Sequence, residues 1–360
     1  MAAASSPAFV GSALADAPTV PMVPLVRVVA EGLNGPLELQ VGVGGFYVAE
    51  GADGEVTRVS PGGKLQTVLS GLPGISGVDV SGGKLLALLG GGGPPEEGPP
   101  PPPAAFPPAS LLGAPLWGGT PRVMADLMGY ELANNPDGQR QFDPETGMPN
   151  DALSNPFYVL ARRGGGALVA DGGANDVLFV KPNGEISTFF VPPTVNTGAC
   201  EGRENNSPET PGCDAVPTGI AYGNDGALYV SALTGEVPGE GRVYKLNGRT
   251  GAVIDVISGF SAPTGVAVGP DGSIYVSELL HNAPAGEPPP DFDPSTVGRI
   301  VRVAPGGART YASVTQPTGL VVHGGRLYSS AWALAGLFFG IPGVGQIVEV
   351  SPAAFLPPGP

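Results

Sequence analysis

One pattern recurs along this chain: an alternating strand, a glycine-rich turn and a second alternating strand. Three copies contain Pro-Thr-Gly: VPTGIAYGNDGALYVSAL begins at Val216, APTGVAVGPDGSIYVSEL at Ala262 and QPTGLVVHGGRLYSSAW at Gln316. Three related copies begin at Gly35, Gly74 and Asn155. Strand alternation on both sides of a short glycine turn indicates a β-hairpin. The chain therefore predicts six hairpins of one kind.

A second pair of strands follows each hairpin except the last. The final unit, GQIVEVSP from Gly345, stops after one strand, and residues 25–33 (LVRVVAEGL) match the strand that it lacks. Six units of four strands predict an all-β fold, a six-bladed β-propeller of four-stranded antiparallel blades. It spans residues 24–351, and the N-terminal strand closes the last blade.

Composition supports this fold class. The 360 residues include 59 Gly and 43 Pro, which break helix interiors and suit short strands joined by tight turns. Because 42% of the residues are hydrophobic and only 14% are charged, most of the chain should fold. We expect residues 1–23 to be signal-like or disordered, and residues 352–360 to form a disordered tail.

Charge and cysteine usage limit the partners and the compartment. The net charge of −15 and the lack of a Lys/Arg cluster exclude a nucleic-acid binder. No stretch is long and apolar enough for a transmembrane helix. We predict a disulfide between Cys200 and Cys213, against the alternative of two free thiols. A disulfide needs an oxidising compartment, so we expect a secreted or periplasmic protein.

The long connections are predicted to gather on one face. If strands A to D of a blade run from the axis to the rim, the A–B and C–D turns are short, and every insertion is a B–C or a D–A connection. The insertions are residues 90–108, 129–154, 192–215, 279–297 and 332–344. Long loops are usually functional or disordered. We predict that this insertion-rich face of a monomer binds a small molecule or a protein.

Two insertions have a distinctive composition. Residues 90–108 are rich in proline, which favours a stiff polyproline II excursion. Residues 331–344 carry Trp332, Phe338 and Phe339. This apolar segment either plugs the funnel at the axis or forms an exposed patch for a partner.

Three carboxylates end strand B in alternate blades: Glu50, Asp171 and Glu278. If they converge on the axis, like charges recruit a cation, and oxygen ligands of this kind suit Ca²⁺. Neutral oxygens at the starts of the innermost strands are candidates to complete a metal site: Asn34, Asn155, Thr218, Thr264 and Thr318. The alternative is that each carboxylate caps backbone amides within its own blade.

The sequence offers few candidates for catalysis. His281 follows Glu278 on the insertion-rich face, so these two are the candidates for a catalytic acid–base pair. His323 lies in a short turn on the opposite face. The common motifs of hydrolases and nucleotide-binding enzymes do not occur. Whether the protein is an enzyme stays open.

Several motifs carry a family resemblance. DLMGYELANNPDG from Asp126, SNPFYV from Ser154, LVADGGANDVLFVKPNGEIST from Leu168 and CDAVPTGIAYGNDGALYVSALTG from Cys213 resemble the ScyD/ScyE family. These are secreted or periplasmic propellers akin to NHL-repeat proteins. The resemblance covers roughly residues 25–352 and brings no catalytic residues with it. More distantly, the chain is similar to streptogramin lyase and to calcium-dependent lactonase propellers.

Two functions follow from these observations. The first is an extracytoplasmic binding scaffold that uses the insertion-rich face. The second is a Ca²⁺-dependent lyase or lactonase-like enzyme built on the axial carboxylates. They differ in geometry, because the enzyme requires those carboxylates to converge on an open pocket.

Overall fold

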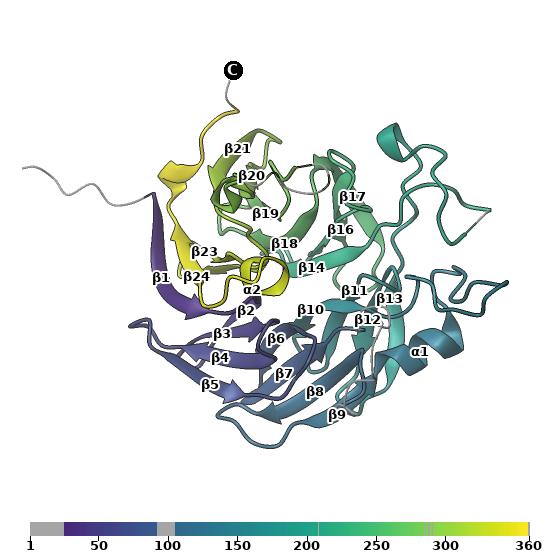
Figure 1. Ribbon diagram of the computed structural model, residues 1–360, viewed down its shortest axis with the longest axis horizontal. Coiled ribbons are helices and arrows are strands. Elements are labelled where there is room, and N and C mark those ends of the chain that lie inside the picture. Colours follow the sequence, from purple (N-terminus) through teal and green to yellow (C-terminus); the bar gives the residue numbers. More distant parts are fainter. Residues whose placement is uncertain are drawn as a thin grey trace, which may run out of the picture.

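The strands form six four-stranded antiparallel sheets set around a common centre (Figure 1). The computed structural model describes residues 25–91, 105–207, 209–284, 286, 289 and 291–358. This is the six-bladed β-propeller that the repeat predicts. In blades 1 to 5, the four strands lie side by side in chain order from the axis to the rim, and each pair is antiparallel.

The blades follow the chain in order. Blade 1 contains β2 (Pro36–Gly42), β3 (Gly45–Glu50), β4 (Glu55–Val59) and β5 (Leu65–Leu69). Blade 2 contains β6 (Ile75–Ser81), β7 (Lys84–Leu89), β8 (Ser110–Pro115) and β9 (Arg122–Asp126). Blade 3 contains β10 (Pro156–Ala161), β11 (Ala167–Asp171), β12 (Asp176–Val180) and β13 (Ile186–Phe190).

The second half repeats the plan. Blade 4 contains β14 (Pro217–Tyr222), β15 (Leu228–Ala232), β16 (Gly241–Leu246) and β17 (Val253–Phe260). Blade 5 contains β18 (Pro263–Val268), β19 (Ile274–Glu278), β20 (Arg299–Val303) and β21 (Arg309–Ser313). Blade 6 contains β22 (Leu320–His323), β23 (Arg326–Ala331), β24 (Gly345–Val350) and β1 (Val26–Leu33).

The two ends of the propeller meet in blade 6. Strand β1 pairs with β24 in antiparallel register, with Val26 opposite Val350 and Leu33 opposite Gly345. Arg27 forms an ion pair with Glu349 across the same ladder. The prediction that the N-terminal strand closes the last blade is confirmed. This closure pairs a strand edge that would otherwise be free.

The Pro-Thr-Gly motif joins neighbouring blades at the axis. The Thr218 hydroxyl donates to the Pro263 carbonyl of the next blade, at 2.7 Å. Thr264 donates to Pro317 in the same way, and Thr318 donates to Pro36, which links blade 6 to blade 1. These threonines, predicted as neutral metal ligands, are therefore links between blades.

The glycine of the motif permits close contact between innermost strands. A Cβ atom on Gly265 would lie 2.1 Å from the Thr318 carbonyl oxygen, far inside van der Waals contact. A Cβ atom on Gly319 would lie 2.7 Å from the Leu37 carbonyl oxygen. At Gly265 and Gly319 the innermost strand of the next blade approaches so closely that a side chain would collide with its backbone.

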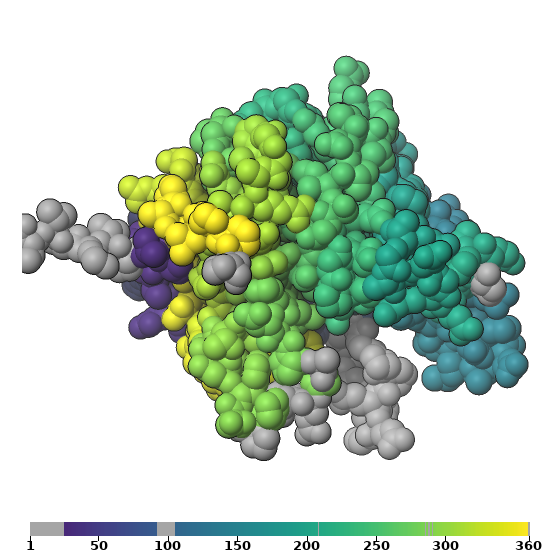
Figure 2. Space-filling model, turned by 90° about the horizontal axis from the view of Figure 1, so that it is seen from above, coloured from purple at the N-terminus to yellow at the C-terminus, as the bar shows by residue number. Residues whose placement is uncertain are grey.

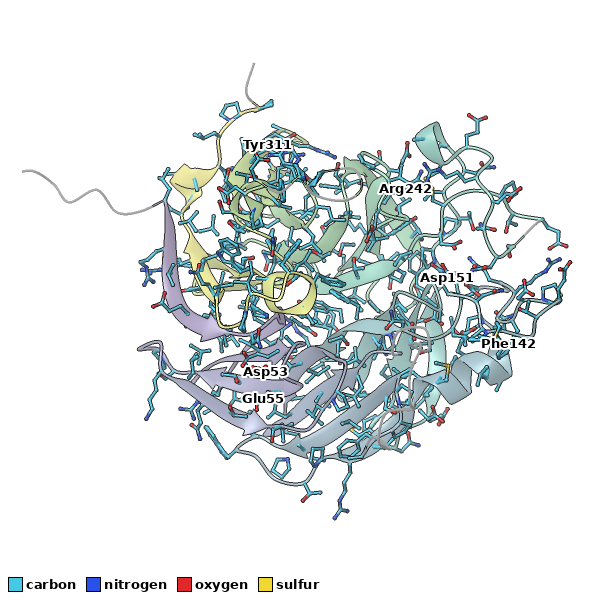
Figure 3. The ribbon with its side chains drawn as sticks, viewed as in Figure 1. Asp53, Glu55, Phe142, Asp151, Arg242 and Tyr311 are labelled. Carbon is cyan, nitrogen blue, oxygen red and sulfur yellow. A yellow bond between two sulfur atoms is a disulfide. The ribbon has the colours of Figure 1, made fainter. Side chains whose placement is uncertain are left out.

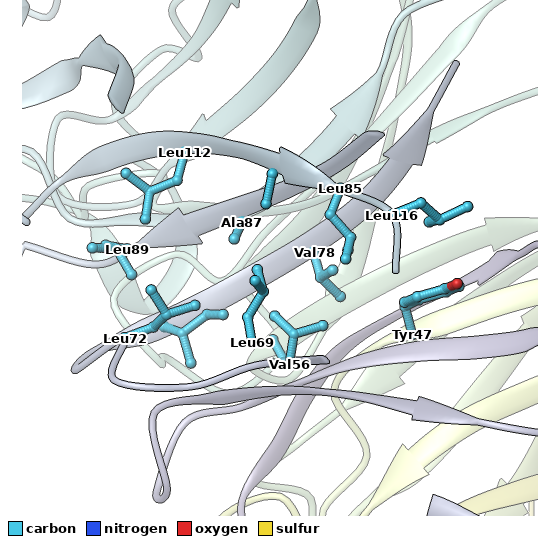
Figure 4. Packing of buried hydrophobic residues seen from close by; sticks show 13 residues of the cluster. Tyr47, Val56, Leu69, Leu72, Val78, Leu85, Ala87, Leu89, Leu112 and Leu116 are labelled. Atoms are coloured by element: carbon cyan, nitrogen blue, oxygen red, sulfur yellow. The ribbon is translucent and has the colours of Figure 1, made fainter. Parts of the chain in front are cut away.

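Apolar side chains fill the spaces between adjacent blades. Figure 4 shows one such layer, in which Val56 and Leu69 of blade 1 face Val78 and Leu85 of blade 2. Tyr47 is fully buried in the same layer. Each sheet packs between its two neighbouring sheets and is therefore covered on both faces, except at the rim.

The B–C and D–A connections leave the same end of each blade, and the long insertions extend there. Those of blades 3 and 4 project sideways (Figures 1 and 2). They include α1 (Leu127–Asn134) and η1 (Gly198–Cys200), and elsewhere on this face lie η2 (Pro294–Thr296) and α2 (Ala335–Phe338). The sequence does not predict helix α1, most of which lies in the insertion 129–154.

The segment around α2 combines the two predicted alternatives. Ala335 is buried, and Leu337 packs near Gly35 and Gly51 at the entrance to blade 1. Phe338 on the same short helix is 75% exposed. The segment therefore covers one side of the axis and also leaves an aromatic ring in solvent.

Three expectations concern the ends and loops of the chain. Residues 1–23 and most of the proline-rich insertion 90–108 lie outside the described residues. The tail after residue 351 differs from the expected disorder. There η3 (Pro352–Ala354) forms, and Leu356 pairs with Tyr311 in a β-bridge. Among the described residues, no helix is long and apolar enough to cross a membrane.

Candidate functional site

The three predicted metal-binding carboxylates each bind donors in their own blade. Glu50 accepts the Asn34 backbone N–H at 2.6 Å. Asp171 accepts the backbone N–H groups of Asn155 at 2.7 Å and Ala174 at 3.1 Å. Each carboxylate thus holds the backbone where the chain enters the innermost strand of that blade. This is the capping role that was the alternative to metal binding.

The structure does not bring these carboxylates together. Within residues 25–91, 105–207, 209–284 and 291–358, no group of three or more His, Cys, Asp and Glu side chains is arranged to hold a metal ion. Of the neutral candidates, Asn155 accepts from Gly91 through its side-chain oxygen. Asn34 donates to Asp53, near Glu55 on blade 1 in Figure 3, and its own side-chain oxygen accepts no hydrogen bond from the described residues. An axial Ca²⁺ site on these residues has no support in this geometry.

The predicted acid–base pair does not form either. Glu278 is almost fully buried, accepts the Ser261 backbone N–H at 2.8 Å and forms an ion pair with Arg299. His281 lies nearby, and burial and then the Arg299 charge lower its pKa. A carboxylate neutralised by a guanidinium is a poor general base. Glu278 is therefore a structural ion-pair partner.

The insertions of blades 3 and 4 build a pocket on the insertion-rich face. Its volume is about 500 Å³. Polar side chains from three separate segments line it, namely Asp137, Gln139, Asn175 and Asp214, and prolines 192, 193 and 211 form part of its wall. This is the face on which the sequence predicts a binding site.

Hydrogen bonds fix the polar side chains of this pocket. Asn175 donates to Asp137 at 3.1 Å and accepts the Val216 backbone N–H at 3.1 Å. The side chain of Gln139 donates to Asp214. The side chains thus connect the insertion after blade 2, the B–C turn of blade 3 and the entry to blade 4.

The two insertions also support each other from outside the pocket. Asp151, labelled with Phe142 on the projecting segment in Figure 3, accepts a hydrogen bond from Asn206. Arg242 of β16 donates to Thr197 at 2.9 Å. The predicted disulfide between Cys200 and Cys213 is confirmed, with the Cα atoms 5.2 Å apart. The pocket wall is therefore cross-linked, although it consists of loops.

The electrostatics of this region are dominated by carboxyl groups. Burial raises the pKa of Asp137 and of Asp214. Burial also raises the pKa of Glu131, behind the pocket, to about 7 and that of Asp171 to about 6. Positive charge brought into this region would be stabilised, because it would interact with several incompletely solvated carboxylates.

A second polar network lies at the axis, and sequence reasoning missed it. Glu38 accepts the backbone N–H groups of Val78 and Val159, both at 3.0 Å. Gln40 donates to both Glu38 and Tyr158, each at 3.3 Å. Burial and the neighbouring Asp79 raise the pKa of Glu38 well above its usual value. The network joins the innermost strands of blades 1, 2 and 3.

A sequence signal for this network exists. Glu38 and Tyr158 occupy the position that is glycine in the Pro-Thr-Gly copies, at Gly219 and Gly265 for example. In blade 2 the same position is Gly77, and a Cβ atom there would lie 2.6 Å from the Glu38 carboxylate. Two large polar side chains thus fill the channel where the other blades have no side chain.

Comparisons with known proteins support the fold. A scan of protein-family models finds no match, and a search of curated proteins finds none either. Among solved structures, a luciferin-regenerating enzyme has 10% identity and a TM-score of 0.56, covering 94% of this chain and 98% of its own. A putative gluconolactonase has 15% identity and a TM-score of 0.53, covering 91% of each chain.

A third structural relative is the PQQ-bound aldose sugar dehydrogenase from Streptomyces coelicolor. It has 15% identity and a TM-score of 0.55, covering 90% of this chain and 97% of its own. These proteins carry different activities on a similar scaffold. At such identities the likeness concerns the propeller alone, because function depends on the residues of each site.

Proposed function

We propose that this protein is a binding propeller whose insertion-rich face captures a small, positively charged ligand in the pocket between blades 3 and 4. The pocket itself carries this proposal: about 500 Å³ of space lined by carboxylate and amide groups. Asp137 and Asp214 accept hydrogen bonds and supply negative charge, whereas the prolines form an apolar wall. An amine or guanidine group on a short apolar stem matches both features.

The pocket is preorganised, which favours binding over a purely structural role. Its polar side chains are held by hydrogen bonds from other segments, and the disulfide fixes one of its loops. Side chains that are already ordered lose little conformational entropy when a ligand arrives. The charge of −15 adds long-range attraction for cations.

The test is a titration with three cationic probes: spermidine, L-arginine and L-lysine. We expect at least one probe to bind by calorimetry, and Asp214→Asn to weaken that binding by roughly tenfold to a hundredfold, because a charge-assisted hydrogen bond is lost. Glu209→Gln, at the pocket edge, should weaken it less. Glu201→Gln, an exposed change on the same loop but outside the pocket, is the matched control and should bind as wild type. No binding by any probe would refute the proposal.

We also infer an extracytoplasmic location and kinship with the ScyD/ScyE family. The disulfide supports the location, because such bonds persist in oxidising compartments. The kinship rests on the motifs that begin at Asp126, Ser154, Leu168 and Cys213, three of which supply Asp137, Asn175 and Asp214 to one pocket. Maleimide labelling of the native protein in its source cells tests the location: Cys200 and Cys213 should resist labelling until a reductant is added.

A further inference from the structure

A group of buried oxygen atoms behind the pocket has no hydrogen-bond donor from the protein. These atoms are both carboxylate oxygens of Asp176, Oε2 of Glu131, Oδ1 of Asn135 and Oε1 of Gln139. Asp176 is completely buried, and Glu131 is 1% exposed. A buried acceptor without a donor is costly, and a buried carboxylate more so. Several in one region require a physical explanation.

Helix α1 and its C-cap supply two of these oxygens. The Tyr130 hydroxyl of the helix accepts the Thr188 backbone N–H of β13 at 3.0 Å, so the helix lies against blade 3. Glu131 lies in the last turn of the helix, and Asn135 caps its end in the left-handed conformation. The Asn135 backbone N–H donates to the Glu131 carbonyl at 2.8 Å, which ends the helix there.

The remaining contacts orient both side chains. Gln141 donates to Glu131 Oε1 at 2.7 Å, and Asn135 donates through Nδ2 to the Gln139 carbonyl at 2.9 Å. Each side chain is thus held by one end, and the free oxygen, Oε2 in Glu131 and Oδ1 in Asn135, is the other end. Donors from nearby residues bind one end of each side chain, and no donor among the described residues reaches the other oxygen.

Asp176 approaches from the blade. It is the first residue of β12 and lies directly opposite Asp171 in the β11–β12 ladder. The side chain of Asn175, next to Asp176 in the chain, donates to Asp137 at 3.1 Å, so the start of β12 lies beside the segment that follows α1. Among the described residues, no ion pair joins a basic side chain to Asp176 or Glu131.

Two states are open to such carboxylates: they stay protonated, or a cation lies among them. The available ligands are oxygen atoms only, with no sulfur or imidazole nitrogen, which suits Ca²⁺. The described residues provide no group of three ionisable ligands. Two carboxylates, Asp176 and Glu131, balance the charge of one Ca²⁺, and neutral amide oxygens extend the set.

We propose that Asp176, Glu131 and the amide oxygen of Asn135 bind one Ca²⁺ ion between helix α1 and blade 3. This site differs from the predicted axial one because Glu50, Asp171 and Glu278 are not among its ligands, and it does not depend on what the pocket binds. Backbone carbonyls and water complete the coordination of six to eight oxygens that Ca²⁺ requires. With only two charged ligands we expect a weak site, with a dissociation constant of roughly 10⁻⁴ to 10⁻³ M.

The ion would stabilise the wall of the pocket. Asp137 and Gln139, which line the pocket, lie within four residues after Asn135 in the chain. An ion held between α1 and β12 would fix this segment against blade 3. Calcium binding is therefore expected to slow amide exchange in residues 131–141 more than in the blades.

The experiment is a thermal melt and a calorimetric titration of the full chain, freed of metal with EDTA and then given CaCl₂. We expect the wild type to melt several degrees higher in 10 mM CaCl₂. The Asp176→Asn variant distinguishes a loss of Ca²⁺ binding from a loss of folding, because its expected effects on the melting temperature differ with and without metal. Without metal it removes a buried charge and should melt at or above wild type, whereas with Ca²⁺ it should gain no further stability.

The controls distinguish this site from general ionic effects. Glu131→Gln should weaken Ca²⁺ binding at least tenfold. Asp79→Asn, a buried acid at the axis, is the matched control and should keep the full Ca²⁺ response. The proposal is overturned if wild type shows no Ca²⁺ response, or if both site variants keep it. An equal rise of the melting temperature in 10 mM MgCl₂ would overturn the assignment to Ca²⁺. The proposed ligand set does not impose the octahedral geometry that Mg²⁺ requires.

Discussion

Asp171 and Asp176 lie directly opposite each other in the β11–β12 ladder, but their carboxyl groups differ in hydrogen bonding. Asp171 accepts hydrogen bonds from Ser154, Asn155 and Ala174, whereas Asp176 receives none. Opposed residues of a ladder point to the same side of the sheet. One member of the pair is therefore a structural cap, and both oxygens of the other are left without a hydrogen-bond donor among the described residues.

The glycine of the Pro-Thr-Gly motif yields the first prediction. Gly265→Ala places a methyl group 2.1 Å from the Thr318 carbonyl oxygen, in the backbone of the next blade. Because neither strand can move without breaking its ladder, we expect a loss of about 3 kcal/mol or more in the free energy of unfolding, measured by urea denaturation. Gly306→Ala is the control, because no atom lies within 4 Å of its Cβ position. Equal losses in both variants would contradict this account of the motif.

The threonine of the motif yields the second prediction. Thr318→Val keeps the shape of the side chain but removes the hydroxyl that donates to Pro36 at 3.1 Å. We expect a loss of about 1 to 3 kcal/mol, because buried carbonyl groups lose a donor. Thr67→Val on the exposed rim strand β5 should change stability by about 0.5 kcal/mol or less. If Thr318→Val left the free energy of unfolding unchanged, closure of the propeller would depend on the β1–β24 ladder alone.

How far the sequence predicts this molecule depends on the kind of contact. The Pro-Thr-Gly copies predict the fold because the motif has a local cause, a hydroxyl and a missing side chain at three of the junctions between blades. Glu50, Asp171 and Glu278 occupy equivalent positions, as predicted, yet they do not converge. They end strand B, which lies one strand spacing of about 4.8 Å further from the axis than strand A, and each meets donors of its own blade first.

The pocket depends on contacts that no local pattern encodes. Gln139 meets Asp214 across 75 residues, and Asn175 meets Asp137 across 38. Helix α1 was hidden by its short length and by Gly129, although Asp126 caps it by accepting the Gly129 N–H at 2.9 Å. The insertion-rich face was predictable from loop lengths, whereas the residues that line its pocket required the fold.

The disulfide yields the third prediction. Cys200 and Cys213 close a short loop, and Val195 pairs with Cys213 through two backbone hydrogen bonds of 2.9 Å. In the chain-entropy model such a cross-link contributes about 3 kcal/mol. We expect the Cys200→Ser/Cys213→Ser double variant to exchange amide hydrogens in residues 195–213 on the order of a hundredfold faster. The blades should exchange as before, because the loop lies outside every ladder. Uniform loss of protection would show that the loop and the propeller unfold together.

The axial acids yield the last prediction, which concerns pH. Burial raises the pKa of Asp79 from 3.8 to about 6, although Val80 and Ala161 donate to it, both at 2.6 Å. The folded protein therefore holds this proton more tightly than the unfolded chain does. Stability is greatest below pH 4 as far as Asp79 is concerned, and it falls as the pH rises toward 6. A shift of about two units corresponds to about 3 kcal/mol.

Asp79→Asn should remove this contribution, so stability should change less between pH 4 and pH 7 than in wild type, as measured by urea denaturation across that range. Glu38, whose pKa is also raised by burial and by Asp79, faces Asp79 near the axis and will leave some slope in the variant. Asp255→Asn on the exposed rim strand β17 is the control and should keep the wild-type slope. If Asp79→Asn also keeps that slope, Asp79 is solvated in solution, and the channel between Glu38 and Tyr158 admits water.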